Sequence, residues 1–260
     1  MVVAISQYKI IFSMTCKLPP TVRVHQIAIF PLGMINAFLV QGPNGCLLID
    51  SGLPNSEDKI RKTLDALNLR FEDIKLIIIT HAHIDHAGNT ATLKALSGAQ
   101  VIAHQADLAY FRGEKKMHFC STGWFGWLFK KTGLIQRAYT AFQPDIVLTQ
   151  GDCFSLSDYG FQGNVVPTPG HTAGSISVVL ENTTALVGDL ISSGILLGGI
   201  MCQHKAKRPP FEDDPLQVSH ALQAITDLGV TRFYMGHGGP LSTPAVQQHI
   251  HNLKCIAHKN

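Results

Sequence analysis

The stretch Thr80-His81-Ala82-His83-Ile84-Asp85-His86-Ala87-Gly88 places three histidines and one aspartate within six residues. It directly follows the apolar run Leu76–Ile79, which predicts a short buried strand. Side chains that can bind a metal are therefore expected where a strand ends and the chain turns. Open α/β sheets usually carry their functional sites at this edge.

Neutral imidazole and carboxylate are the ligands that suit Zn²⁺, Fe and Mn. A turn at a strand end can point His81 and His83 to one side while Asp85 and His86 point elsewhere. One such stretch can therefore serve two adjacent metal ions. The alternative is a histidine-rich surface loop, and the density of ligand-type side chains behind a buried strand argues against it.

The composition indicates a folded globular chain. Apolar residues make up 45% of the 260 residues and charged residues only 15%, which favours a sizeable core over disorder. The net charge of +3 is too small to indicate nucleic-acid binding. We expect one domain over residues 1–260 with its core at about 22–258, a small-molecule substrate and no nucleic-acid partner. The sequence leaves the oligomeric state open.

The six cysteines are widely spread and contain no C-x-x-C pair, which argues against a disulfide scaffold or a zinc finger. Most are expected to be small buried residues in a reducing compartment. The beginning of the chain lacks the basic region of a signal peptide, and the longest apolar stretch, 190–201, is too short to cross a bilayer. We therefore expect a cytoplasmic protein without a membrane partner.

Alternating and helical apolar patterns predict one α/β domain with helices on its outer faces. Strands are expected at 22–30, 35–40, 46–50, 75–80, 101–103, 146–148, 153–156, 163–167, 175–180, 184–187 and 232–235. Helices are expected at 56–67, 90–96, 105–111, about 125–130, after Asp214-Pro215 and after Thr243-Pro244. Residues 1–20 are left as an edge strand of uncertain role.

Residues 113–143 interrupt this rhythm and contain both tryptophans, Trp124 and Trp127. Two interpretations stay open for this segment. It is either an insertion that packs on the core or a lid over the substrate, because aromatic surface beside a polar metal site suits an apolar part of a substrate.

Three further ligand-type residues stand beside glycine after or between predicted strands: His171 in Pro169-Gly170-His171-Thr172, Asp189 after Gly188, and His237 in Gly236-His237-Gly238-Gly239. Glycine lets the backbone come close to a site. Each signal alone is weak, but together they extend one pattern. The candidate residues become His81, His83, Asp85, His86, His171, Asp189 and His237.

These motifs, in this order and over roughly residues 22–258, resemble the metallo-β-lactamase-fold hydrolases. The resemblance implies a four-layer αββα sandwich with the metals at one edge. It divides the candidates into two sets and a bridge: His81, His83 and His171 for one metal, Asp85, His86 and His237 for the second, and Asp189 between them. It also implies that Asp50, in Ile49-Asp50-Ser51-Gly52, supports the ligand loop from outside the metals.

The implied cofactor is two Zn²⁺ ions per chain, with Fe or Mn as alternatives because the same ligands accept them. Such a pair would share a hydroxide that attacks a carbonyl carbon. Asp85 or a metal-bound water would protonate the leaving group. The prediction is a dinuclear zinc hydrolase acting on an ester, lactone, thioester or amide of a small molecule.

Several branches of the family fit less well. Acyl-homoserine lactonases carry a tyrosine soon after the bridging aspartate, where this chain has Leu190-Ile191-Ser192-Ser193. A C-terminal extension like that of glyoxalase II enzymes and the larger inserts of nucleases are expected to be absent. The basic run His204, Lys205, Lys207 and Arg208 is either a solvated loop or an anion site that favours an acidic substrate.

Three rival functions remain. A mononuclear iron persulfide dioxygenase would use only the His81, His83 and His171 side with Asp189, and the complete second set argues against it. A non-catalytic metal-binding protein is disfavoured because no ligand position is missing. β-Lactamase activity stays open, although the expected lack of an export signal argues against a periplasmic resistance role.

Overall fold

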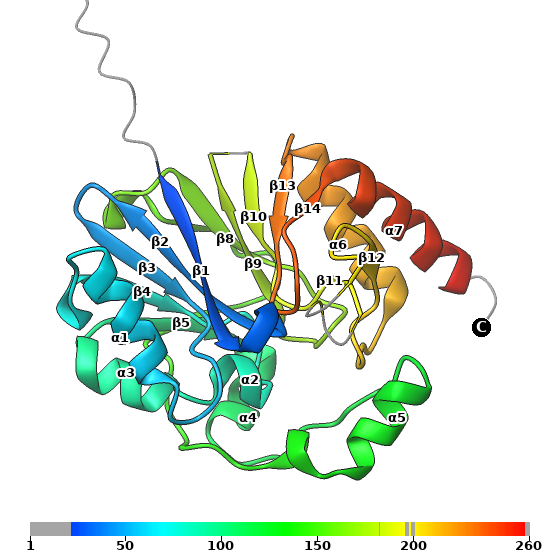
Figure 1. The fold of residues 1–260 in the computed structure, drawn as a ribbon, viewed down its shortest axis with the longest axis horizontal. Helices are drawn as coiled ribbons and strands as arrows, with labels where there is room; N and C mark the ends of the chain where they lie inside the picture. The colour runs from blue at the N-terminus through cyan, green and yellow to red at the C-terminus, as the bar shows by residue number, and fades with distance from the viewer. Residues whose placement is uncertain (1–21, 182, 196–197, 199–200, 258–260) are drawn as a thin grey trace, which may run out of the picture.

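Two six-stranded sheets stand face to face in the computed structural model, which describes residues 22–181, 183–195, 198 and 201–257 (Figure 1). The strands of the first sheet follow chain order: β1 (Arg23–Phe30), β2 (Ile35–Gly42), β3 (Gly45–Ile49), β4 (Ile74–Ile78), β5 (Gln100–His104) and β6 (Ile146–Leu148). The pairs from β1 to β3 are antiparallel, and those from β3 to β6 are parallel.

The second sheet belongs mainly to the C-terminal half of the chain. Its strand order is β14 (Leu241–Ser242), β13 (Arg232–Tyr234), β10 (Thr184–Leu186), β9 (Ile176–Leu180), β8 (Gly163–Pro167) and β7 (Phe154–Ser155). Only β10 and β13 pair in parallel. A short ribbon of β11 (Ser192–Ser193) and β12 (Ala206–Lys207) stands apart from both sheets.

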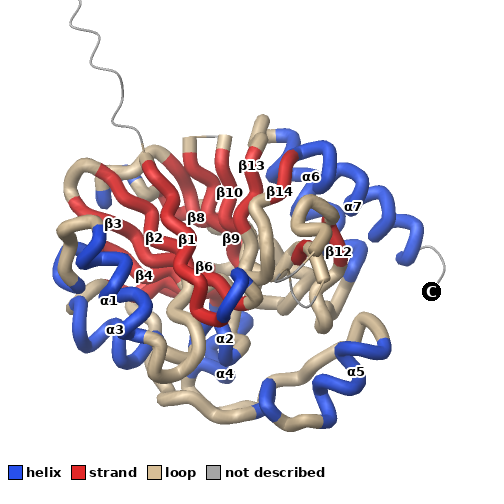
Figure 2. The backbone as a smooth tube through the Cα atoms, viewed as in Figure 1, coloured by secondary structure: helices blue, strands red, loops and turns tan. Residues whose placement is uncertain are grey.

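Helices cover the outer face of each sheet, which gives four layers (Figures 1 and 2). On the first sheet lie α1 (Glu57–Ala66) and α3 (Thr90–Ser97), and on the second lie α6 (Pro215–Asp227) and α7 (Thr243–Ala257). The short α2 (Ile84–Ala87) and α4 (Leu108–Phe111) and the inserted α5 (Trp124–Lys131) lie at one end of the sandwich. This arrangement is the αββα sandwich that the motifs implied.

The core has three parts because successive side chains of a strand point to opposite faces of its sheet. In β2, Phe38 and Val40 pack between the sheets, whereas Leu39 packs toward the first pair of helices. Leu222 of α6 and Ile250 of α7 bury the outer face of the second sheet. The near-continuous apolar strands of the sequence therefore reflect sheets that are covered on both faces.

The predicted strands and helices are present, with changes at their ends. The helix expected at 105–111 splits into a 3-10 turn at Gln105–Asp107 followed by α4. The two-residue strands β11, β12 and β14 were not predicted, because two residues are too short to show a pattern. The edge strand suggested for residues 1–20 lies outside the described residues.

The prediction that most cysteines are buried is wrong for the described ones. Cys46 is buried, Cys120 and Cys202 are half-buried, and Cys153 and Cys255 are exposed. The exposed and half-buried cysteines lie in connections or on the outer layer formed by α7, where a small thiol is not excluded from water. In the described part of the chain, no helix combines the length and the apolar character needed to cross a membrane.

Candidate metal centre

The predicted ligands lie in the connections that follow strands, with Asp85 and His86 on the short α2. His81 follows β4, His171 lies between β8 and β9, Asp189 follows β10 and His237 follows β13. The structure brings all seven predicted residues together in two groups whose nitrogen and oxygen atoms lie within 4.8 Å of one another inside each group. The groups are His81, His83, His171 and Asp189, called the first group, and Asp85, His86 and His237, called the second group.

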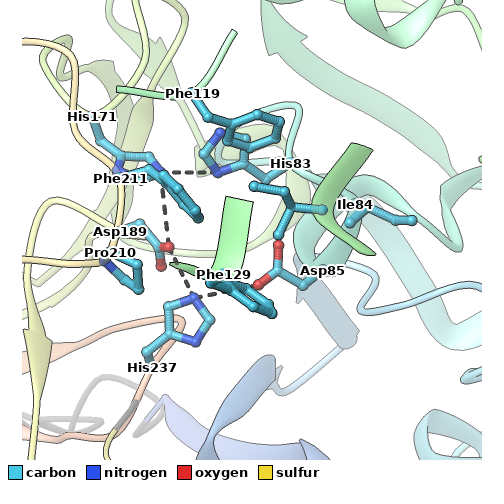
Figure 3. A pocket seen from close by; sticks show the side chains of 11 residues that line it. His83, Ile84, Asp85, Phe119, Phe129, His171, Asp189, Pro210, Phe211 and His237 are labelled. Carbon is cyan, nitrogen blue, oxygen red and sulfur yellow. Dashed lines mark hydrogen bonds and ion pairs between the residues drawn. The ribbon is translucent and has the colours of Figure 1, made fainter. Parts of the chain in front are cut away.

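The first group is a triangle of buried imidazole nitrogens. His81 Nε2 lies 3.0 Å from His83 Nδ1, and His171 Nε2 lies 3.1 Å from each of them. Asp189 Oδ2 lies 3.8 Å from His171 Nε2. Figure 3 shows the carboxylate of Asp189 between His171 and His237.

The second group meets the first through the same carboxylate. Asp189 Oδ2 lies 3.0 Å from His237 Nε2, and Asp189 Oδ1 lies 3.3 Å from His86 Nε2. Asp85 Oδ2 is 3.3 Å from His237 Nε2 and 3.9 Å from His86 Nε2. Asp189 is therefore in contact with both groups, while Asp85 faces the second one.

Asp50 fixes the loop that carries four of these residues. Its carboxylate accepts hydrogen bonds from the Thr80 backbone N–H at 2.8 Å, the Thr80 hydroxyl at 2.9 Å and His86 Nδ1 at 2.7 Å. Its φ of 61° lies in the left-handed region, which aspartate and asparagine adopt more readily than most residues. Such a conformation persists where surrounding contacts enforce it. The structure thus places Asp50 in the supporting position that the resemblance implied.

Hydrogen bonds on the outer side of three rings set which nitrogen faces the centre. The Thr80 hydroxyl donates to Asp50, so His81 Nδ1, 3.0 Å away, must donate to the Thr80 oxygen. His86 Nδ1 donates to Asp50, and His237 Nδ1 donates to the backbone oxygen of Met34. The Nε2 atoms of these rings therefore carry lone pairs that point inward.

These inward atoms fit a cation. The lone pairs of His86 Nε2 and His237 Nε2 face carboxylate oxygens, so acceptors meet acceptors. Among the described side chains, buried His86 Nε2 and Asp189 Oδ1 have no hydrogen-bond partner. Buried polar atoms of this kind are costly unless something satisfies them. A divalent cation in each group would do so with nitrogen and carboxylate ligands of the types that zinc prefers.

The two groups differ in their electrostatics. Burial, together with the neighbouring imidazoles, lowers the pKa of His83 to about 3 and that of His171 to about 4. Burial also opposes charge on His237, but Asp189 and Asp85 outweigh it and raise the pKa of His237 to about 10. The first group therefore favours neutral imidazoles. The carboxylates of the second group attract positive charge, which a divalent cation would supply in place of a proton on the rings.

Two further residues hold the loops of the candidate ligands, and no sequence motif pointed to either of them. Buried Asp107 Oδ2 accepts hydrogen bonds from the Ala82 N–H at 3.0 Å and the Thr172 hydroxyl at 3.1 Å, so it joins the loops of His83 and His171. Asn36 Nδ2 donates to the backbone oxygens of Gly33 and Gly238 and so fixes the loop of His237. Neither lies in a ligand motif, and only their polar side chains within or just after apolar strands gave a signal.

A pocket opens beside the two groups. Its polar side consists of His83, Asp85, His171, Asp189 and His237. Its apolar side includes Phe119 and Phe129 of the 113–143 segment and Phe211 of the chain after β12 (Figure 3). The aromatic surface that the lid interpretation requires next to the candidate metal site is therefore present.

The tryptophans do not provide this surface. Trp124 is 78% exposed and Trp127 is 55% exposed, and neither lines the pocket. Phe119 and Phe129 line the pocket instead, while the tryptophans of α5 are exposed to solvent.

The 113–143 segment is joined to the rest of the protein through the chain around Pro210. The Thr122 N–H donates to the Pro210 oxygen at 2.9 Å, and the Glu212 N–H donates to the Cys120 oxygen at 3.0 Å. Gly126 lies so close that an added Cβ would stand 2.2 Å from the Pro210 oxygen. The predicted basic run does not line this pocket: Arg208 Nε pairs with Glu212 at 2.8 Å, and His204 and Lys205 are exposed.

Known proteins resemble this chain in sequence and in fold. The uncharacterized protein YobT of Bacillus subtilis is 29% identical over 85% of this chain and 91% of its own length. The probable metallo-hydrolase YqjP of the same organism is 28% identical over 82% of this chain and 70% of its own. The metallo-β-lactamase family protein TTHA1429 from Thermus thermophilus has the same fold, with a TM-score of 0.64, 21% identity, and coverage of 91% of this chain and 79% of that one.

A four-layer sandwich with histidine and aspartate groups at its edge, together with these relatives, defines a metal-dependent hydrolase. The family model of the metallo-beta-lactamase superfamily matches residues 30–239, and the chain belongs to this superfamily. The resemblance inferred from the motifs is thereby confirmed.

Proposed function

We propose that this chain is a dinuclear zinc hydrolase that cleaves an ester, lactone, thioester or amide bond of a small molecule. The observation that carries the proposal is the presence of two complete groups of donors with Asp189 in contact with both, at 3.0 Å from His237 Nε2 and 3.8 Å from His171 Nε2. A bridging carboxylate between two such groups suits a pair of neighbouring divalent cations.

In this proposal each group holds one ion. His81, His83 and His171 would hold the first through neutral imidazoles, and Asp85, His86 and His237 would hold the second. When bound, two such ions lower the pKa of a water molecule and polarise the carbonyl under attack. The contacts of Asp50 with His86, and of Thr80 with His81, keep the rings oriented for this task.

Asp85 is the residue we assign to proton transfer. It lines the pocket, and its side chain is 22% exposed, whereas Asp189 is only 4% exposed. A proton held at Asp85 can therefore reach a leaving group in the pocket without passing through the protein interior. Asp189 is enclosed, so in this proposal it would help to hold the ions and would not exchange protons with the pocket.

The phenylalanine side of the pocket supports a substrate with an apolar part. Phe119 stacks on His83 with ring centroids 4.8 Å apart, and it packs edge to face with Phe211 at 5.1 Å. These rings keep water away from the bond to be broken and offer surface to an apolar group next to it. The substrate classes that fit are acyl esters, lactones and thioesters with such a group.

The test is the metal content of the freshly purified chain by elemental analysis, combined with hydrolysis assays before and after chelation. We expect close to two zinc ions per chain, loss of hydrolysis on chelation and its return on adding zinc. A single iron per chain would instead favour the persulfide dioxygenase reaction. Hydrolysis that survives complete metal removal would overturn the mechanism.

The substrate class is tested separately with a panel of esters, lactones, thioesters and β-lactams. We expect turnover to rise with the size of the apolar acyl group, because the phenylalanine side of the pocket would bury it. Preference for β-lactams over every other class would instead make β-lactamase the main activity.

A further inference from the structure

Helix α5 presents two different faces. Toward the protein, Phe129 lines the pocket, Phe125 stacks on Phe129 with centroids 6.0 Å apart, and Gly126 rests on Pro210. The opposite face consists of residues spaced three and four apart: Trp124, Trp127, Leu128 and Lys131. The three apolar side chains of this outer face are 78%, 55% and 51% exposed.

This exposure is concentrated in one segment. The 113–143 segment holds both tryptophans of the chain, and it also exposes Leu128 and Leu134. Single exposed apolar residues are ordinary, but a contiguous apolar patch marks a binding surface. Because the patch lies on the back of the helix whose front lines the pocket, a partner bound there would sit beside the catalytic site.

The charge of the same segment identifies the kind of partner. It contains five basic residues and one acid, Glu114, which gives +4, while the whole chain carries +3. All other residues together therefore carry −1. Lys115, Lys116, Lys131 and Arg137 are exposed, and Glu114 already pairs with Arg112 at 3.8 Å. The positive charge of this protein is thus concentrated around its exposed aromatic patch.

We propose that the outer face of α5 docks the enzyme on the surface of an anionic lipid bilayer. Tryptophan side chains favour the interface between lipid and water, and nearby lysines are attracted to anionic headgroups. The Lys131 ammonium lies 3.6 Å from the centre of the Trp127 ring, so charge and aromatic surface belong to one patch. The docking is peripheral, and it revises the expectation, drawn from the sequence, that the chain has no membrane partner.

The principal alternative occupant is a second copy of the chain. A symmetric dimer through α5 would bring two segments of charge +4 together, which costs free energy unless other groups compensate. An anionic lipid surface instead complements the charge. The proposal does not depend on the hydrolase mechanism, because it concerns the face of α5 that points away from the pocket.

Intrinsic fluorescence gives a direct test, because both tryptophans of the chain lie on this face. Full-length, zinc-loaded protein is mixed with vesicles of phosphatidylcholine alone or of phosphatidylcholine with phosphatidylserine, and binding is also measured by co-sedimentation. We expect a blue shift of the emission and co-sedimentation only with the anionic vesicles. Both effects should weaken at high salt, which screens exposed charges.

Variants locate the effect on α5. The double variant Trp124→Ala/Trp127→Ala should lower vesicle binding at least about tenfold, from lost apolar burial, and Lys131→Gln should lower it about fivefold. The control is Leu216→Ala/Leu228→Ala, which removes exposed apolar side chains at α6 and should bind as the parent does. Zinc content and melting temperature establish that each variant is folded.

Three results would overturn the proposal. The first is that the parent protein does not bind anionic vesicles, or that it binds phosphatidylcholine vesicles equally well. The second is that the tryptophan variant binds as the parent does, which would place the contact elsewhere. The third is that the parent self-associates without lipid and the tryptophan variant does not, which would make this face an interface between copies of the chain.

Discussion

The two sides of the pocket are built in different ways. The polar side draws its residues from loops after strands of both sheets, and buried hydrogen bonds from Asp50, Asp107 and Asn36 fix those loops. The aromatic side comes largely from one inserted segment, which meets the rest of the protein around Pro210. The polar side can therefore hold reacting groups in fixed positions, while the aromatic side can change without disturbing them.

This difference suggests a division of labour. Changes on the polar side should affect metal binding and the rate of reaction for every substrate. Changes on the aromatic side should affect the choice of substrate and leave metal binding intact. The effects of variants on the two sides should therefore differ in kind as well as in size, with the largest losses of activity on the polar side.

The His83→Ala variant should lose hydrolysis almost completely while remaining folded. His83 contributes one of three nitrogens that lie 3.0 to 3.1 Å apart in the first group, and no other side chain can replace it. We expect activity to fall by more than the roughly 10–100-fold typical of residues that only orient a ligand. Elemental analysis should show the loss of about one metal per chain.

The matched control is His251→Ala, which removes an exposed imidazole from α7 that belongs to neither group. It should keep the activity and the metal content of the parent. If His83→Ala turned over substrate at the parental rate, the polar side of the pocket would not be the catalytic one.

The Asp50→Asn variant should show the next largest effect. Asparagine tolerates the φ of 61° found at this position but cannot accept the His86 and Thr80 hydrogen bonds in the same way. We expect a loss of about 10–100-fold in metal affinity or activity. A zinc titration of activity should show that excess metal restores part of it.

Asp152→Asn is the control for this prediction. Asp152 accepts hydrogen bonds from the backbone N–H and hydroxyl of Thr149, as Asp50 does from Thr80, but it lies outside the two groups. Its substitution should leave zinc affinity unchanged. Equal losses in both variants would mean that the effect of Asp50 is a general one on folding.

The difference between the polar and the aromatic side of the pocket also explains which features could be predicted from the sequence. The candidate ligands carry chemistry that is visible in residue types, and His81, His171 and His237 each follow a strand with a clear apolar pattern. Their gathering in one place could therefore be predicted from the sequence alone. The fold followed from strands that are apolar on both faces and from helices with one apolar face.

The supporting residues and the aromatic side could not be placed in this way. Asp107 is one of many aspartates until the fold brings it to Ala82, 25 residues away in the chain. The direction of each aromatic ring on α5 depends on how the helix packs against Pro210, which no local pattern of the 113–143 segment encodes. The sequence therefore left open whether the 113–143 segment packs on the core or covers the site, and it could not show that Phe119 and Phe129 line the pocket.

The Asp107→Asn variant tests whether the joining of two ligand loops matters for the polar side. An amide in place of the carboxylate cannot accept equally well from Ala82 and Thr172, so the loops of His83 and His171 should lose their fixed separation. We expect a loss of about tenfold in activity, at the lower end for residues that orient ligands. Steady-state kinetics should place the loss in kcat for small and large substrates alike.

Asp145→Asn is the control, because Asp145 also accepts from a backbone N–H, that of Val101 at 2.8 Å, away from the ligand loops. Its kinetics should match those of the parent. A loss in Asp107→Asn that appeared only in KM for large substrates would contradict a role on the polar side.

The smallest effect is expected on the aromatic side, where Phe129→Ala and Trp124→Ala change two aromatic residues of the same helix. Phe129 lines the pocket, whereas Trp124 is 78% exposed on the opposite face. Aromatic contacts contribute about 0.5–1.5 kcal/mol, so Phe129→Ala should raise KM roughly two- to tenfold for a water-soluble substrate with a large apolar group. Zinc content should not change. Trp124→Ala should leave KM for the same substrate unchanged. A rise in KM as large as that in Phe129→Ala would mean that the outer face of α5 also contacts substrate. The distinction between the two faces of α5 would then be lost.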